Sequence, residues 1–262
     1  MRKWEATGTV KGIFVVVHGA MEHHGRYGWL ITMLQTSGYH VIAGDLPGQG
    51  LSTRSQRGHI NSFNEYIEEV SIWVEEAMKE GVPIYLLGHS MGGLTVIRFM
   101  QETDYPIAGV ILSSPCLGLA KYPPVPLNAI SVGLNWIKPN LKIASNISIE
   151  DTSRDEDIIE RALNDSLYVQ KVSVRWYREL IKSMKLAFDK ADQLPNVPLL
   201  VMQGGDDKIV DKYAVRKWFN SLNTEERMYK EWRDCYHELF NEPEREDIFR
   251  FTEGFLQMQI NK

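Results

Sequence analysis

The sequence has few of the features that mark several classes of protein. Its 262 residues include only two cysteines, Cys116 and Cys235, with no Cys-x-x-Cys spacing. This argues against a zinc site or a redox pair and favours two buried thiols. No apolar run is long enough to cross a bilayer, and the first eight residues lack the apolar core of a signal peptide. We therefore expect a cytoplasmic protein.

Basic runs, internal repeats and low-complexity tracts are also missing. The formal charge of −5, from 29 basic and 34 acidic residues, argues against nucleic acid as a partner. What remains is the composition of an ordinary globular protein, 44% hydrophobic and 24% charged. A chain of this length buries enough surface to fold without a metal or a disulfide, and α/β proteins of this size are commonly single domains.

Short apolar runs alternate with segments of helical periodicity along most of the chain. Strands are predicted at residues 12–17, 39–43, 84–87, 107–112, 197–202 and 228–231. Between them apolar residues recur at helical spacing, as in the acidic stretch 63–78, where Phe63, Ile67 and Val70 fall on one stripe. Strands that alternate with helices indicate an α/β protein with a mostly parallel, twisted sheet and helices on both faces.

Residues 117–194 interrupt this alternation, because they hold helical patterns and no convincing strand. Ser153-Arg-Asp-Glu156 is a capping-box pattern for a helix that follows it. An insertion at the end of a parallel strand is well placed to cover a site above the sheet. We therefore predict a core of residues 1–116 and 195–262 and a helical cap, or lid, of residues 117–194.

The segment around Gly88-His-Ser-Met-Gly92 carries the candidate chemistry. An apolar strand ends at Gly88, Ser90 follows, and helical spacing begins at Gly92. This is the G-x-S-x-G nucleophile elbow in its strand, turn and helix context. The glycines lack Cβ, so strand and helix can approach closely, and free amides at the helix start suit a developing oxyanion. Ser90 is the predicted nucleophile, and a capping serine in an ordinary turn is the alternative.

A nucleophilic serine needs a general base, usually a histidine oriented by a carboxylate. In this architecture the acid and then the histidine follow the serine along the chain. His237 is the histidine that lies after the elbow with an acid loop between them, so it is the predicted base. Asp206 and Asp207 both lie in the glycine-rich turn after residues 197–202, and turn geometry alone does not choose between them.

Two backbone amides should form an oxyanion hole, one after the nucleophile and one in the loop after the first core strand. The amide of Met91 supplies the first and that of Ala20 the second. His18 is expected to be a structural hydrogen-bonding residue at the strand end. Residues 22–26 form either a site for a polar substrate group or a charge cluster at a helix start.

Five motifs follow one another along the chain: His18-Gly-Ala-Met-Glu-His-His-Gly-Arg-Tyr27, Asp45-Leu-Pro-Gly-Gln-Gly-Leu-Ser52, Gly88-His-Ser-Met-Gly-Gly93, Gln203-Gly-Gly-Asp-Asp207 and Tyr236-His237. Together they resemble the monoacylglycerol lipase and lysophospholipase group of α/β-hydrolases, serine hydrolases of the S33 type, and especially the phospholipase-type members from bacilli. The resemblance covers essentially the whole chain. The family more often has histidine where Gln49 stands.

The resemblance implies the α/β-hydrolase fold, with the cap inserted after the family's sixth strand, here 107–112. It implies a triad of Ser90, Asp207 and His237, because the family's G-x-x-D pattern selects Asp207, and it implies no cofactor and no metal. The implied activity is that of a carboxylic ester hydrolase that cleaves acyl esters of glycerol-based lipids. The implied substrate is a small molecule, either a monoacylglycerol or a lysophospholipid.

Two alternatives stand beside this function. A proline-specific aminopeptidase of the same fold would need acidic groups for the substrate amine, for which Glu22, Asp151 and Asp155 are the candidates. A non-catalytic ligand-binding module of the same fold is the alternative from another class. The expected substrate contacts are Glu22 and the apolar cap residues Leu127, Ile130, Leu134, Trp136 and Ile137. We also expect transient contact of the cap with a membrane surface.

Overall fold

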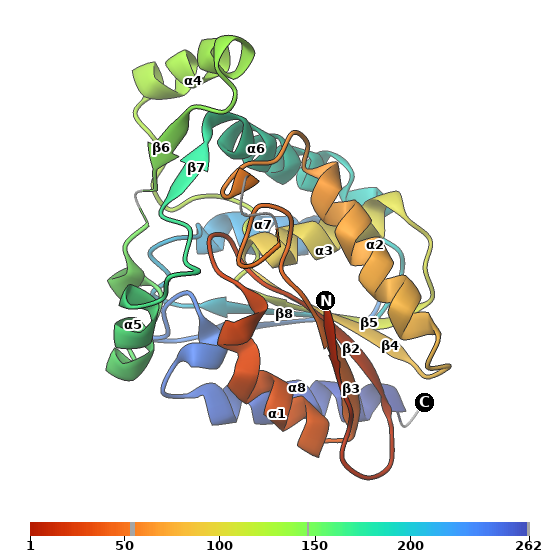
Figure 1. Cartoon of the computed structure of the whole chain (residues 1–262). Helices are drawn as coiled ribbons and strands as arrows, with labels where there is room; N and C mark the ends of the chain where they lie inside the picture. Colours follow the sequence, from red (N-terminus) through yellow and green to blue (C-terminus); the bar gives the residue numbers. More distant parts are fainter. Residues whose placement is uncertain (53–55, 146, 261–262) are drawn as a thin grey trace.

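A seven-stranded sheet lies between two layers of helices in the computed structural model, which describes residues 1–52, 56–145 and 147–260 (Figure 1). The strand order is β1-β3-β2-β4-β5-β8-β9, and every neighbouring pair is parallel except β1 with β3. The strands are β1 (Arg2–Trp4), β2 (Gly12–Val17), β3 (Tyr39–Ala43), β4 (Ile84–His89), β5 (Ile107–Ser113), β8 (Leu199–Gly204) and β9 (Arg227–Trp232). The predicted fold class is confirmed.

Helices cover both faces of this sheet (Figure 1). They are α1 (Gly28–Thr36), α2 (Asn64–Met78), α3 (Met91–Glu102), α7 (Lys212–Ser221) and α8 (Arg245–Ile260), with the short 3₁₀ helices η1 (His24–Tyr27) and η5 (Leu239–Asn241). Along β2, Phe14 and Val16 pack in the core cluster with α1 and α8, whereas Ile13, Val15 and Val17 pack in the cluster with α2 and α3. Both faces of β2 are therefore buried, which explains its continuous apolar run.

The core elements lie close to their predicted positions, with small shifts at the ends. The predicted strand 84–87 continues to His89, because Gly88 and His89 still pair with Leu112 and Ser113 of β5. The strand β1 is an addition that the apolar pattern does not predict, because it has only three residues and two of them are charged. It forms the antiparallel edge of the sheet beside β3.

Residues 117–194 contain more than helices. They hold α4 (Val125–Ile137), β6 (Lys142–Ala144), η3 (Ile149–Asp151), α5 (Glu156–Leu163), β7 (Lys171–Ser173), α6 (Val174–Asp189) and η4 (Ala191–Gln193). The expectation of no strand is wrong, because β6 and β7 form an antiparallel pair. Each has three residues, too few to show a period of two. The segment follows β5, the predicted strand at residues 107–112, which is the fifth strand among the described residues and not the sixth.

The capping-box prediction at residues 153–156 is also corrected. Asp155 is the N-cap of α5, since its carboxylate accepts hydrogen bonds from the amides of Asp157 and Ile158. The Ser153 hydroxyl instead donates to the carbonyl of Asn241, 2.7 Å away. That bond ties the segment to the loop before α8.

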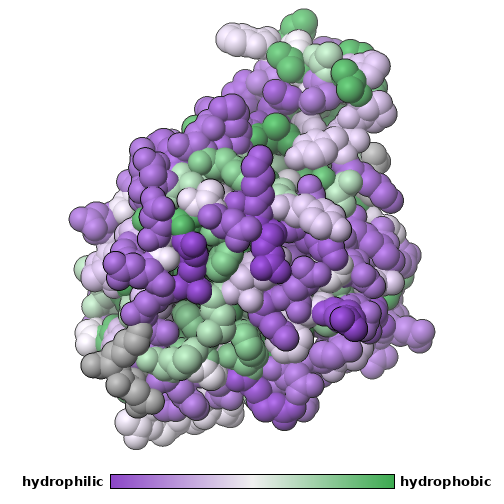
Figure 2. Space-filling view, turned by 180° about the vertical axis from the view of Figure 1, so that it is seen from behind, coloured by the Kyte–Doolittle hydropathy of each residue, from purple (hydrophilic) through white to green (hydrophobic). Residues whose placement is uncertain are grey.

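The helix α4 projects from the rest of the molecule with its apolar side chains uncovered (Figures 1 and 2). The side chains of Trp136 and Ile137 are 85% and 77% exposed, Leu127 and Ile130 are exposed by more than half, and Leu134 is half-buried. Within the described ranges, no helix combines the length and the apolar character that crossing a membrane requires.

Candidate active site

Ser90 occupies the sharp turn between β4 and α3. Its φ of 51° is a left-handed value that residues other than glycine rarely adopt. Its amide donates to the carbonyl of Ser113 at 3.0 Å, and its carbonyl accepts from the amide of Cys116 at 2.9 Å. The end of β5 and the residues after it therefore hold the turn in its strained conformation.

The glycines on either side let this turn pack against neighbouring backbone. A Cβ on Gly92 would lie 2.1 Å from the carbonyl oxygen of Val17, and a Cβ on Gly88 would lie 2.6 Å from the carbonyl oxygen of Gly92. Any side chain at either position would therefore collide with backbone. The close approach that the elbow motif predicts is present.

His237 and Asp207 form a buried hydrogen-bonded pair. The Nδ1 atom of His237 lies 2.8 Å from Oδ2 of Asp207, and their side chains are 5% and 0% exposed. The other oxygen of Asp207 accepts from the amides of Ile209 and Val210, each at 2.9 Å. The Gln203 side-chain amide donates to Oδ2 at 2.8 Å. These donors fix the carboxylate so that it orients the imidazole ring.

Ser90 and His237 line the same narrow cavity of about 20 Å³, which has room for about one water molecule. Asp207 lies behind His237, whereas its neighbour Asp206 is exposed. Ala20 also lines the cavity. The structure therefore brings the predicted nucleophile, base and acid together with one predicted oxyanion donor, and it distinguishes the two aspartates.

The electrostatics of the pair suit a general base. Burial lowers the pKa of His237, but attraction from the Asp207 carboxylate, with Glu238 and Glu22, more than offsets it, so this pKa lies above its ordinary value. Burial acts to raise the pKa of Asp207, but the His237 ring and two backbone amides outweigh it, so this pKa lies below its ordinary value. Asp207 thus stays ionised and favours an imidazolium beside it.

The loop after β2 is held by bonded amides on either side of Ala20. The amide of Gly19 donates to Oε1 of Glu22 at 2.5 Å, and the amide of Met21 donates to Oε1 of Gln49 at 2.9 Å. Ala20 lies between them and faces the cavity. Gln49, which stands where the family more often has histidine, therefore supports the loop that carries the predicted oxyanion donor. His18 is structural, as predicted, since its Nε2 accepts from the amide of Leu46 at 2.9 Å.

The sequence did not single out Glu238, His89 or Gln203, although all three lie at the site. Arg26 donates to Glu238 at 2.8 Å and lies 3.7 Å from Glu22. The ring of His89 lies beside that of His237, and Gln203 holds Asp207. His89 and Gln203 lie at the carboxyl ends of parallel strands, where functional groups collect. Their positions in the sequence could therefore have identified them as candidate site residues.

The predicted substrate contacts are only partly brought to the cavity. Glu22 lines it, but its carboxylate already accepts from Gly19 and from the Tyr27 hydroxyl at 2.6 Å. The five apolar residues of α4 do not line it. Asp151 pairs with Lys208 at 3.4 Å and Asp155 caps α5, so neither is placed to hold a substrate amine.

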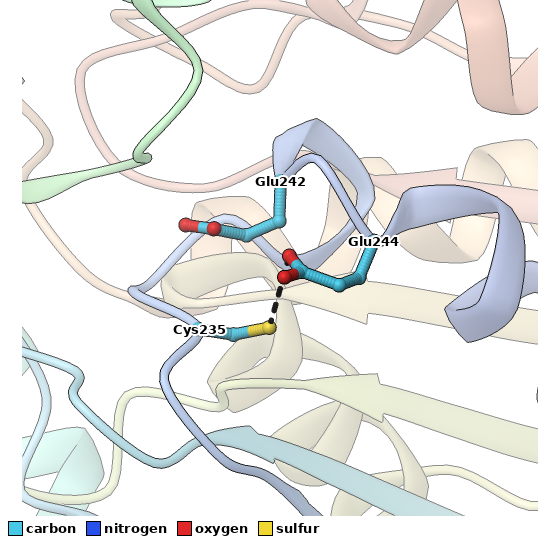
Figure 3. Close-up of side chains that lie close together, drawn as sticks. All are labelled: Cys235, Glu242 and Glu244. Carbon is cyan, nitrogen blue, oxygen red and sulfur yellow. Dashed lines mark hydrogen bonds between the residues drawn. The ribbon is translucent and has the colours of Figure 1, made fainter.

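One cluster outside this cavity has side chains of the types that bind metals. Ligand atoms of Cys235, Glu242 and Glu244 lie within 4.8 Å of one another (Figure 3). The Arg154 guanidinium already occupies this position, since its Nε donates to Glu242 at 2.7 Å and an Nη donates to Glu244. Burial raises the pKa of the Cys235 thiol to about 12, so near pH 7 the thiol is not ionised and cannot act as a thiolate ligand. The cluster is an ion-pair network rather than a cation site.

Known proteins resemble this chain over nearly its whole length. The family model described as "Serine aminopeptidase, S33" matches residues 8–244. The chain is 53% identical to "Phospholipase YtpA" of Bacillus subtilis over 99% of this chain and 100% of that protein. It is 29% identical to human "Monoglyceride lipase" over 92% of this chain and 80% of that protein. The crystal structure of Paleococcus ferrophilus monoacylglycerol lipase matches with a TM-score of 0.87, 32% identity, and coverage of 100% of this chain and 99% of that one.

Proposed function

The chain belongs to the serine aminopeptidase S33 family, and we propose that Ser90, His237 and Asp207 are the catalytic triad of its ester hydrolysis. The activity is that of a carboxylic ester hydrolase on acyl esters of glycerol-based lipids, as its phospholipase and monoglyceride lipase relatives indicate. The observation that carries the triad is the buried 2.8 Å bond between His237 and Asp207 beside the strained Ser90.

The reaction follows from these positions. His237 Nε2 takes the proton of the Ser90 hydroxyl as Oγ attacks the ester carbonyl carbon. The amides of Met91 and Ala20 stabilise the oxyanion, each contributing about 3 kcal/mol. The tetrahedral intermediate collapses, the alcohol leaves with the proton from His237, and an acyl ester remains on Ser90. Water then attacks that ester with the same histidine as base, which releases the fatty acid and restores the serine.

We propose a cytoplasmic enzyme that meets its substrate at a lipid surface through residues 117–194, acting as a cap. The cavity at Ser90 holds about 20 Å³, far less than an acyl chain needs, so the cap must move for substrate to enter. The exposed apolar side chains of α4, including Trp136 and Ile137, give this segment a surface that a membrane or micelle would bury (Figure 2). No cofactor enters the mechanism.

The direct test is Ser90→Ala, assayed on a monoacylglycerol, a lysophospholipid, a diacyl phospholipid and a p-nitrophenyl ester. We expect turnover to fall to background on every ester, and labelling by a fluorophosphonate probe to disappear with it. Undiminished turnover in the variant would remove Ser90 from the mechanism. Hydrolysis of a proline anilide by the unmodified protein, with no hydrolysis of glyceryl esters, would establish the aminopeptidase instead.

A further inference from the structure

A larger cavity lies among η1, α5 and the start of α8. Its volume is about 270 Å³, against about 20 Å³ around Ser90. Arg26, Arg161 and Arg245 line it, one from each of these three regions. We call it the arginine cavity. Its size approaches that of sites that hold a small-molecule group.

Two of the three positive charges in the arginine cavity are not compensated. Arg26 is paired with Glu238 and Glu22. In the part of the chain that the structure describes, Arg161 and Arg245 make no ion pair, and Arg245 stacks at 4.9 Å from the centre of the Trp29 ring. The carboxylate that lines the cavity, Asp165, is held by His23 at 2.7 Å. Among the described residues, the cavity therefore holds two guanidinium groups, those of Arg161 and Arg245, that no carboxylate pairs.

We infer that the arginine cavity binds a phosphate group. Guanidinium groups present paired N–H donors that match phosphate oxygens, and two of them on facing elements can hold one group between them. A neutral glycerol group would use none of these charges.

The cavity is placed to receive a group attached to the substrate at Ser90. Arg26 lines both the arginine cavity and a narrow space of about 20 Å³ beside it. That space shares Glu22, His89 and Glu238 with the cavity at Ser90. The phosphate of a lysophospholipid whose acyl ester lies at Ser90 would therefore fall on the arginine side. This assignment of the phosphate to a lipid headgroup rests on the proposed function.

The test compares two esters that differ only in the phosphate, 1-decanoylglycerol 3-phosphate and 1-decanoylglycerol. In the double variant R161Q/R245Q we expect KM for the phosphate ester to rise about tenfold, because charge-assisted hydrogen bonds are lost. KM for the neutral ester should stay within about twofold, since neither arginine lines the cavity at Ser90. Arg250→Gln, on the exposed face of α8, is the matched control and should change neither value.

A second measurement does not depend on activity. Inorganic phosphate should raise the Tm of the unmodified protein and leave that of R161Q/R245Q unchanged. If Tm responds but KM for the phosphate ester does not, the cavity binds free phosphate rather than a headgroup. If neither responds, the inference is overturned. If the unmodified protein hydrolyses neither ester, the proposed function fails while Tm still decides whether the cavity binds phosphate.

Discussion

The imidazole ring of His89 packs against that of His237, with the ring centroids 4.7 Å apart. Burial, with the neighbouring His237, lowers the pKa of His89 to about 4. The Nδ1 atom of His89 also lies 3.1 Å from the carbonyl oxygen of Ser113, which fixes the ring. His89 is therefore neutral near pH 7 and supports the base without repelling the imidazolium that forms on it.

This relationship predicts the pH dependence of the reaction. Only neutral His237 can accept the Ser90 proton, so kcat/KM should fall as the pH drops through the pKa of His237. That pKa is raised above its ordinary value of 6.5, so the midpoint of the acid limb should lie above pH 6.5. Initial rates on a soluble p-nitrophenyl ester, measured from about pH 5 to about pH 9, test this. A midpoint well below 6.5 would contradict it.

Asp207→Asn, compared with Asp206→Asn, should show which aspartate of the turn orients His237. The variant loses the charge that orients and stabilises the imidazolium, and kcat should fall by about 10⁴. The acid limb of the residual activity should also move to lower pH, because the attraction that raises the pKa of His237 is gone. Asp206→Asn, at an exposed neighbour, should keep activity within about twofold. An equal loss in both variants would refute the assignment.

The core could be predicted from the sequence because a strand that is buried on both faces consists of consecutive apolar residues. Residues 12–17 are apolar without interruption because α1 and α8 cover one face of β2 while α2 and α3 cover the other. The elbow could be predicted for a similar reason, since backbone contacts at Gly92 exclude every side chain. Asp207 needed the family resemblance, because the hydrogen bonds that distinguish it from Asp206 form only in the folded chain.

Residues 117–194 were harder to predict, because apolar spacing predicts a helix without saying what covers it. The pattern on α4 predicted a pocket lining, whereas Trp136 and Ile137 are exposed. The ion pair of Arg26 with Glu238 joins residues 212 positions apart, and a single sequence gives no sign of such a pairing. The arginine cavity depends on the same long-range contacts.

Glu22→Ala should destabilise the protein, because its carboxylate serves three buried partners. It accepts from the Gly19 amide and the Tyr27 hydroxyl and lies 3.7 Å from Arg26. Truncation leaves the Gly19 amide and the Tyr27 hydroxyl buried without this acceptor and removes one of the two carboxylates beside Arg26, so the free energy of unfolding should fall by about 3 kcal/mol. Urea unfolding measures the change. Glu75→Ala, whose carboxylate bonds the Tyr105 hydroxyl in an exposed position, is the control and should cost under about 1 kcal/mol. If the free energy of unfolding fell as little as in the control, the Glu22 carboxylate would not contribute to stability.

The double variant Trp136→Ser/Ile137→Ser should separate binding to a lipid surface from ester cleavage. Burial of these two side chains in a lipid surface contributes about 2 kcal/mol or more, so the variant should bind phospholipid vesicles at least about tenfold more weakly. Neither residue lines the cavity at Ser90, so hydrolysis of a soluble p-nitrophenyl ester should be unchanged.

Ile72→Ser, at a half-exposed position on α2, is the control for general loss of apolar surface. Vesicle co-sedimentation gives the measurement, and equal binding by the unmodified protein and the double variant would exclude α4 as the contact. A parallel loss of activity on the soluble ester would instead place α4 in the catalytic pocket, as the sequence pattern alone predicts.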